Sequence, residues 1–148
     1  MTIVDLSSSL SASADAVWNA VKTPAAFRKV TRGLLTMPVI NKRRDEWDEG
    51  ETVIGWVFLF GFIPFSHHHL HIAKIDEEAR TLSSREQGGL VKRWDHNIIV
   101  TQVSPETCSY RDRIDIDAGF VTPVVVLYAR FFYRIRQRRW RALARGMC

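Results

Sequence analysis

Cysteine is scarce in this chain of 148 residues, which contains only Cys108 and Cys148. Two cysteines without CxxC spacing exclude a disulfide framework and a cysteine-based zinc site. A protein that does not depend on disulfides fits a reducing compartment. The first residues also lack the basic segment and following apolar run of a signal peptide. We therefore expect a cytoplasmic protein.

Long hydrophobic runs are missing as well. The longest uncharged apolar run covers residues 53–65, only 13 positions, and it contains two glycines and a proline. A membrane-spanning helix needs about 20 apolar residues, so this run is too short. The sequence also lacks a phosphate-binding glycine loop, a dinucleotide fingerprint, a nucleophile elbow and an HExxH motif. We therefore expect no cofactor.

Acidic residues are absent after Asp117, where the chain has seven arginines. Residues 118–148 carry a formal charge of +7, and residues 1–117 carry −2. Arginines near the end of a helix are typical of a solvated terminus that favours the helix dipole. The strands offer no matching basic strip, which argues against nucleic acid. The alternative is weak contact with anionic lipid through Arg134, Arg138, Arg139 and Arg141.

The periodicity of the chain predicts its elements. Alternating polarity over residues 4–12 predicts a strand, and Ser13 and Thr23-Pro24 then predict the starts of two short helices, the second ending near Gly33. Turn-forming residues separate six further candidate strands of an antiparallel meander, at 35–44, 50–60, 66–75, 80–87, 92–103 and 107–117. Thr122-Pro123 opens a last helix that runs to about Ala144. Its predicted apolar face consists of Val124, Leu127, Tyr128, Phe131, Phe132 and Ile135.

This order of elements carries a family resemblance. The segment Leu10–Trp18, the Thr23-Pro24 restart, the turns at Gly50 and Asp76 and the C-terminal amphipathic helix resemble the START-like superfamily (SRPBCC, the Bet v 1-type helix-grip fold). Within it the sequence is similar to the polyketide cyclase/dehydrase-like branch. The resemblance covers nearly the whole chain, taken as one domain over 1–148. It implies an α+β fold in which a curved seven-stranded antiparallel sheet wraps around the long C-terminal helix, with two short helices after the first strand.

The same resemblance implies a cavity between the sheet and the C-terminal helix for a small hydrophobic ligand of lipid-like, polyketide or aromatic type. The fold hosts both carriers and enzymes, so it does not decide between them. We expect the lining to come from large side chains of the strands and the helix. These are Trp56, Phe58, Phe60, Trp94, His96, Ile98, Tyr110, Asp112, Tyr128, Phe131 and Phe132.

A polar pair falls among the apolar residues of two predicted strands. If Val103 pairs with Thr107 across the turn at residues 104–106, Ile98 lies opposite Asp112, and His96 becomes a diagonal neighbour of Asp112 on the inner face. An aspartate that orients a histidine is a common general base. In an enzyme, His96 would remove a proton alpha to a carbonyl, with Asp112 orienting it and Tyr110 or an arginine polarising the oxygen. The alternative is a structural hydrogen bond between two buried polar groups.

The segment 67–71 contains four histidines. Alternation on a strand places His67, His69 and His71 on one face, and these are weak candidates for a metal site. Because a strand rises about 3.3 Å per residue, at most two of the three reach one ion. We therefore expect no metal, and we expect these imidazoles on a face of the strand that is solvated or borders the cavity mouth.

A last feature is the apolar tip Phe62–Phe65 that follows the aromatic run 56–60. Loops are usually exposed and polar, so this tip requires a cover. The resemblance implies that it borders the cavity mouth and gates ligand entry. It is alternatively a homodimer contact, a lipid-docking tip of an interaction module, or a segment folded over the N-terminal helices.

Overall fold

The structure is a computed structural model that describes residues 2–43 and 45–147. Its elements follow the chain in this order: β1 (Thr2–Leu10), α1 (Ala14–Val21), α2 (Pro24–Thr31), β2 (Leu35–Thr36), α3 (Pro38–Asn41), β3 (Thr52–Leu59), β4 (Ile63–Asp76), β5 (Thr81–Gly88), β6 (Val91–Ser104), β7 (Thr107–Asp117), a 3-10 turn η1 (Gly119–Val121) and α4 (Thr122–Arg145). Cys148 lies outside the described residues.

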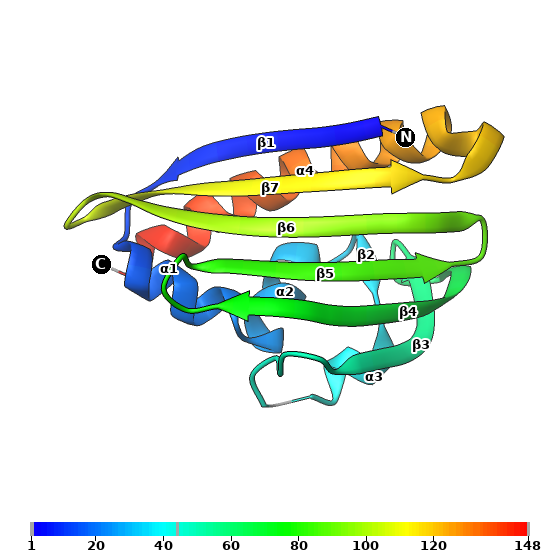
Figure 1. The fold of residues 1–148 in the computed structure, drawn as a ribbon, viewed down its shortest axis with the longest axis horizontal. Coiled ribbons are helices and arrows are strands. Elements are labelled where there is room, and N and C mark those ends of the chain that lie inside the picture. Colours follow the sequence, from blue (N-terminus) through cyan, green and yellow to red (C-terminus); the bar gives the residue numbers. More distant parts are fainter. Residues whose placement is uncertain (1, 44, 148) are drawn as a thin grey trace.

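The seven strands form one antiparallel sheet in the order β1-β7-β6-β5-β4-β3-β2. The sheet curls around α4, and α1 and α2 lie beside the same helix (Figure 1). This arrangement confirms the predicted helix-grip fold. The two predicted helix starts are also confirmed, because the Ser13 hydroxyl accepts from the Ala16 amide at 3.2 Å and the Thr23 hydroxyl accepts from the Ala26 amide at 3.2 Å.

The segment predicted as a strand over 35–44 is mostly not one. Only Leu35–Thr36 pairs with β3, and the short helix α3 follows from Pro38. Proline has no amide hydrogen for the ladder and its φ suits the first position of a helix, so the strand stops there. The predicted boundary at 66 was also wrong, since β4 begins at Ile63 and Pro64 pairs beside a bulge at Val57/Phe58.

The long helix α4 has the predicted start, length and periodicity, but its buried face is rotated from the predicted one. Its buried residues are Thr122, Val126, Ala129, Phe132, Tyr133, Arg136, Gln137, Trp140 and Ala144. Val124, Leu127 and Phe131, which we predicted on the apolar face, are exposed. The rotation follows from two polar residues, Arg136 and Gln137, that occupy the buried stripe.

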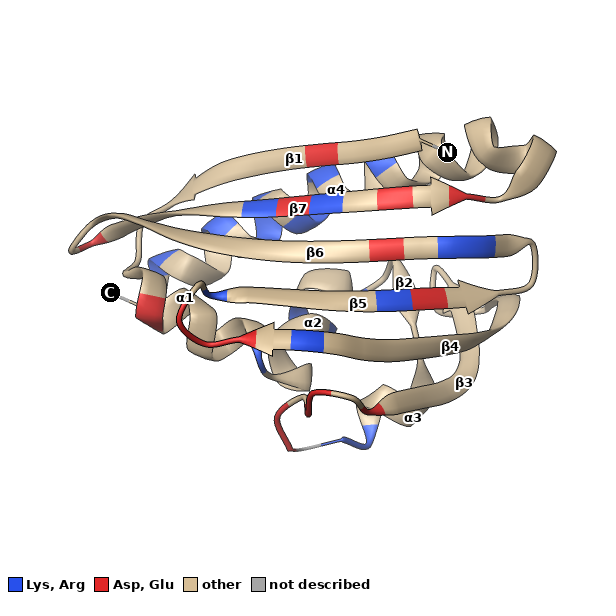
Figure 2. Ribbon diagram, viewed as in Figure 1, with Lys and Arg blue, Asp and Glu red and all other residues tan. Residues whose placement is uncertain are grey.

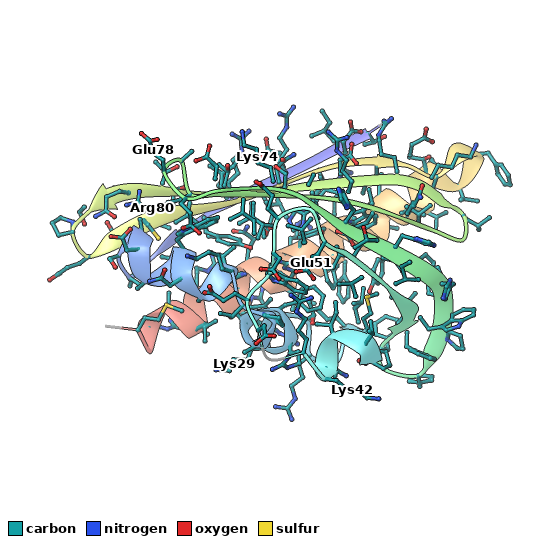
Figure 3. All side chains as sticks on the ribbon, turned by 60° about the horizontal axis from the view of Figure 1, so that its bottom comes forward. Lys29, Lys42, Glu51, Lys74, Glu78 and Arg80 are labelled. Atoms are coloured by element: carbon teal, nitrogen blue, oxygen red, sulfur yellow. The ribbon has the colours of Figure 1, made fainter. Side chains whose placement is uncertain are left out.

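Side chains fill most of the space between the sheet and the helices (Figure 3). In that view the labelled Lys74 and Glu78 lie on the outer side of the sheet, and Lys29 and Lys42 lie on the opposite side of the molecule. The core forms two clusters. One joins α1, α2 and Trp140 to the middle strands, and the other joins the first half of α4 to β1 and β7.

Candidate functional site

A cavity of about 340 Å³ lies between the inner face of the sheet, the short helices and α4. Most of its lining is apolar, including Met37, Val57, Leu70 and Ile72. A smaller set of lining side chains carries polar atoms, namely Trp47, His68, Ser84, Glu86, Trp94, His96, Tyr128, Tyr133, Arg136 and Trp140. The site is therefore an apolar chamber with polar groups along part of its wall.

Five of the predicted lining residues face this cavity: Trp94, His96, Ile98, Tyr128 and Phe132. Trp56, Phe58 and Phe60 do not line it, and β3 instead contributes Val57 and Leu59. Trp56 is half exposed on the other face of the strand, with its ring centroid 5.7 Å from that of His67. Because both faces of this strand are apolar, alternation did not reveal which face turns inward.

Three other predicted lining residues also lie elsewhere. Phe131 is exposed on the outer side of α4. Tyr110 and Asp112 are completely buried behind the cavity wall, so they reach a ligand only through their neighbours.

The predicted pairing of His96 with Asp112 is present. Ile98 lies opposite Asp112 and His96 opposite Ile114, as expected. The turn differs, because Ser104 rather than Val103 pairs with Thr107 and Val103 forms a bulge. Nε2 of His96 donates to Oδ1 of Asp112 over 2.7 Å. A carboxylate only accepts, so the proton is on Nε2 and the other ring nitrogen, Nδ1, remains for other partners.

Asp112 is the centre of a buried polar network. The Tyr110 hydroxyl donates to Oδ1 at 3.2 Å, and Nε2 of Gln137 donates to Oδ2 at 2.9 Å. Nη2 of Arg136 lies 3.9 Å from Oδ1 and donates to the Tyr110 oxygen at 3.2 Å. Burial raises the pKa of Asp112, but the charge of Arg136 and the hydrogen bonds of His96 and Gln137 outweigh it and hold the pKa below its ordinary value. Asp112 is therefore a carboxylate near neutral pH.

The same environment fixes the protonation of the two neighbours of Asp112. Burial raises the pKa of Tyr110, and the nearby carboxylate raises it further, so the phenol stays neutral. Burial alone lowers the pKa of Arg136, but Tyr110 and Asp112 raise it above its ordinary value. The guanidinium is thus a permanent buried cation at the cavity wall.

A second polar group lies on the neighbouring strands. Nε2 of His68 donates to Oε1 of Glu86 at 3.0 Å, and the Ser84 hydroxyl donates to Oε2 at 3.0 Å. Burial raises the pKa of Glu86, but the interaction with His68 outweighs it and the pKa falls below its ordinary value. Ser84 lies opposite His96 in the sheet, so the two polar groups adjoin.

Sequence reasoning missed Arg136, Gln137, Tyr133 and His68 as members of this site. The charge pattern of the C-terminal segment places Arg136 among the solvated cations of the helix end. The sequence does contain a pattern that points to Arg136. It lies at helical spacing from Phe132, Tyr133 and Trp140, so all four share one face of the helix.

The histidine cluster divides as alternation predicts. His67 is exposed and His69 and His71 share its face, whereas His68 turns inward beside Leu70. Among residues 2–43 and 45–147, no group of three or more histidine, cysteine, aspartate or glutamate side chains could hold a metal ion.

The apolar tip and the arginines also have defined places. Phe62 and Ile63 are exposed, and Phe65 is exposed but also lines the cavity, so the tip borders it. Arg134, Arg138 and Arg141 are exposed along α4, whose basic residues appear blue in Figure 2.

Arg139 differs from these three arginines, because its guanidinium donates to the carbonyls of Val30 and Arg32 at the end of α2. Dimerisation through the tip and lipid contact through the exposed arginines stay predictions. No helix in the described part of the chain is long and apolar enough to cross a membrane.

Solved structures with this fold are numerous. A START superfamily protein from Mycobacterium smegmatis has a TM-score of 0.74 at 10% identity, over 99% of both chains. Norcoclaurine synthase from Thalictrum flavum, in complex with dopamine and hydroxybenzaldehyde, has a TM-score of 0.71 at 16% identity, over 99% of this chain and 88% of the other. The Zhui aromatase/cyclase from Streptomyces sp. R1128 has a TM-score of 0.69 at 12% identity, over 97% and 93%.

These likenesses show the START-like fold. No curated protein matches the sequence. A family model does match it, over residues 8–145. The chain therefore belongs to the family described as "Domain of unknown function (DUF8410)".

Proposed function

We propose that this protein binds a small hydrophobic ligand with a polar group, held between the sheet and α4. The observation that carries the proposal is the cavity of about 340 Å³ with its largely apolar lining. Its volume falls in the usual range of small-molecule sites, roughly 300–1,000 Å³. The likeness to norcoclaurine synthase, solved with two small aromatic molecules, and to an aromatase/cyclase supports an aromatic or polyketide-like ligand.

Apolar contact supplies most of the affinity in such a site, and a few polar groups set the orientation. Ile98, Leu82 and Phe132 are among the apolar walls. His96 orients the ligand from the polar side, because Asp112 fixes its proton on Nε2 and leaves Nδ1 for the ligand.

Filling the cavity tests the proposal. Ile98→Trp places a larger side chain on the inner face of β6, and we expect it to weaken binding of the neutral fluorescent probe N-phenyl-1-naphthylamine by about tenfold or more. Overpacking costs typically about 1–3 kcal/mol, so we expect the variant to fold. Fluorescence titration measures the affinity, and circular dichroism checks the fold.

Ile99→Trp is the matched control, since the neighbouring residue does not line the cavity. It should bind the probe like the unmodified protein. Equal binding by both variants, or no binding by the unmodified protein, contradicts a ligand site in this cavity.

We propose as the second candidate a cyclase- or dehydratase-type enzyme, favoured by the 2.7 Å bond between His96 and Asp112 at the cavity wall. In this reaction Nδ1 of His96 removes the proton alpha to a substrate carbonyl, and the carbonyl oxygen gains negative charge as the enolate forms. Arg136 is the polarising group in this arrangement, because Tyr110 does not line the cavity.

Proton exchange tests this candidate with a simple ketone. With 2-acetylnaphthalene in D₂O, the unmodified protein should speed deuterium uptake at the methyl group, as measured by NMR, and His96→Ala should lose this effect. General-base catalysis contributes typically 10²–10⁴-fold. His67→Ala, at an exposed histidine, serves as the control. Exchange that is equally fast in His96→Ala rejects the mechanism.

A further inference from the structure

Two buried N–H donors on the cavity wall have no hydrogen-bond partner among the described residues. They are Nε of Arg136 and Nε1 of Trp140. The two side chains are 4% and 2% exposed, and both line the cavity. They lie one helical turn apart on α4, so they share one face of the helix.

An unpartnered buried donor is costly, because it has lost its hydrogen bond to water without replacement. Other side-chain donors close to these two do have hydrogen-bond partners. Nε1 of Trp94 donates to the Tyr133 hydroxyl at 3.2 Å, and Nε2 of Gln137 donates to Asp112. Of the three buried donors without a partner among the described residues, those of Arg136 and Trp140 belong to side chains that line the cavity, and Nε of Arg93 does not.

Aromatic contacts hold both donors in place. The guanidinium carbon of Arg136 lies 5.2 Å from the centre of the Tyr133 ring and 5.9 Å from that of Phe132. The ring of Trp140 stacks on Tyr110 with centroids 4.9 Å apart. Donors that are already ordered lose little entropy when they bind an acceptor.

The acids at the cavity wall and directly behind it already have hydrogen-bond partners. Asp112 accepts hydrogen bonds from His96, Tyr110 and Gln137, and its Oδ1 lies 3.9 Å from Arg136, beyond hydrogen-bond distance. Glu86 accepts from His68 and Ser84. Arg136 is therefore a cation with an unused donor on a side chain that lines an apolar chamber, and Trp140 beside it is a second lining side chain with an unused donor.

We propose that Arg136 and Trp140 form the subsite for an anionic oxygen of the ligand, such as a carboxylate at the end of an apolar body. This inference rests on the proposed ligand site and names its ligand class. Charge-assisted hydrogen bonds in a low-dielectric chamber are stronger than neutral ones, so the subsite selects acids over alcohols and amines of the same shape.

Three probes with one skeleton test the selectivity: 2-naphthoate, 2-naphthylmethanol and 2-naphthylmethylamine, each titrated by calorimetry at pH 7. We expect the naphthoate to bind at least about tenfold more tightly than the alcohol, and the protonated amine to bind more weakly than both. Trp140→Phe keeps the stacked ring and removes only the N–H group. It should weaken naphthoate binding severalfold and alcohol binding less, because the carboxylate forms the stronger hydrogen bond.

Arg136→Gln removes the charge and should abolish the preference for the acid. Because this change also leaves Asp112 without its cation, Trp140→Phe remains the test if that variant does not fold. Arg134→Gln, on the exposed face of the same helix, is the control and should keep the preference.

Equal affinity for all three probes, or a preference that survives Trp140→Phe and Arg136→Gln, overturns the subsite but leaves the ligand site standing. Failure of all three probes and of N-phenyl-1-naphthylamine to bind overturns the ligand site itself.

Discussion

Replacing Asp112 with asparagine should lower the free energy of unfolding by about 3–5 kcal/mol, the usual cost of removing one partner of a buried ion pair. The carboxylate is completely buried and accepts from His96, Tyr110 and Gln137. Without it, the buried charge of Arg136 has no counter-charge within 4 Å among the described residues. Urea denaturation at pH 7 measures the change.

Asp115→Asn is the control for this prediction. Asp115 lies on the other face of β7, where it pairs with Arg93 at 3.3 Å and both side chains are partly exposed. A pair of this kind contributes about 0–1 kcal/mol. If both asparagine variants lose the same small amount, the buried network does not stabilise the fold as we argue.

The contribution of Asp112 to the free energy of unfolding should also depend on pH and should be lost in acid. Its pKa is lowered in the folded protein. Its stabilisation is therefore complete above the pKa of an unfolded aspartate, about 3.9, and is lost as the pH falls through the lower folded value. The difference in stability between the unmodified protein and Asp112→Asn should shrink below about pH 4.

Two adjacent phenylalanines of α4 should respond very differently to the same substitution. Phe132→Ala should cost about 3–5 kcal/mol, because it removes a buried aromatic side chain from the core. Phe132 is 4% exposed and packs against Tyr128 and Tyr133, with ring centroids 5.9 and 5.0 Å apart. Thermal or urea unfolding measures the loss.

Phe131→Ala is the matched control, since its side chain is 49% exposed. It should change the stability by less than about 1 kcal/mol, as surface substitutions usually do. The comparison tests the rotation of the helix directly. A larger loss for Phe131 than for Phe132 would show that Phe131, and not Phe132, packs into the core.

The sequence was sufficient for the architecture because its signals are local. Ser13 and Thr23 cap the predicted helices, and the turn residues separate strands whose register between His96 and Asp112 is as predicted. These features depend on neighbours in the chain, or on one hairpin. The strand predicted at 35–44 was wrong because Pro38 ends the ladder and its apolar residues are equally compatible with a short helix.

Side-chain directions were less predictable where polarity did not distinguish two faces. Trp56 and Val57 are both apolar, and the smaller residue is the buried one. On α4 an arginine and a glutamine lie in the buried stripe, which inverts the usual hydrophobic pattern. They are buried because they are partners of Asp112 on β7. This contact joins two elements that are distant in the sequence, so the pattern within α4 does not reveal it.

The bulge at Val103 determines which residue the hairpin of β6 and β7 can lose without a change in its register. Gln102 pairs with Cys108 in the same register that aligns Ile98 with Asp112, and Val103 is the residue that the ladder skips between Gln102 and Ser104. Its side chain is exposed. Deletion of Val103 therefore leaves His96 and Asp112 in the same register. Related sequences can differ in length at this position and still keep the polar pair aligned.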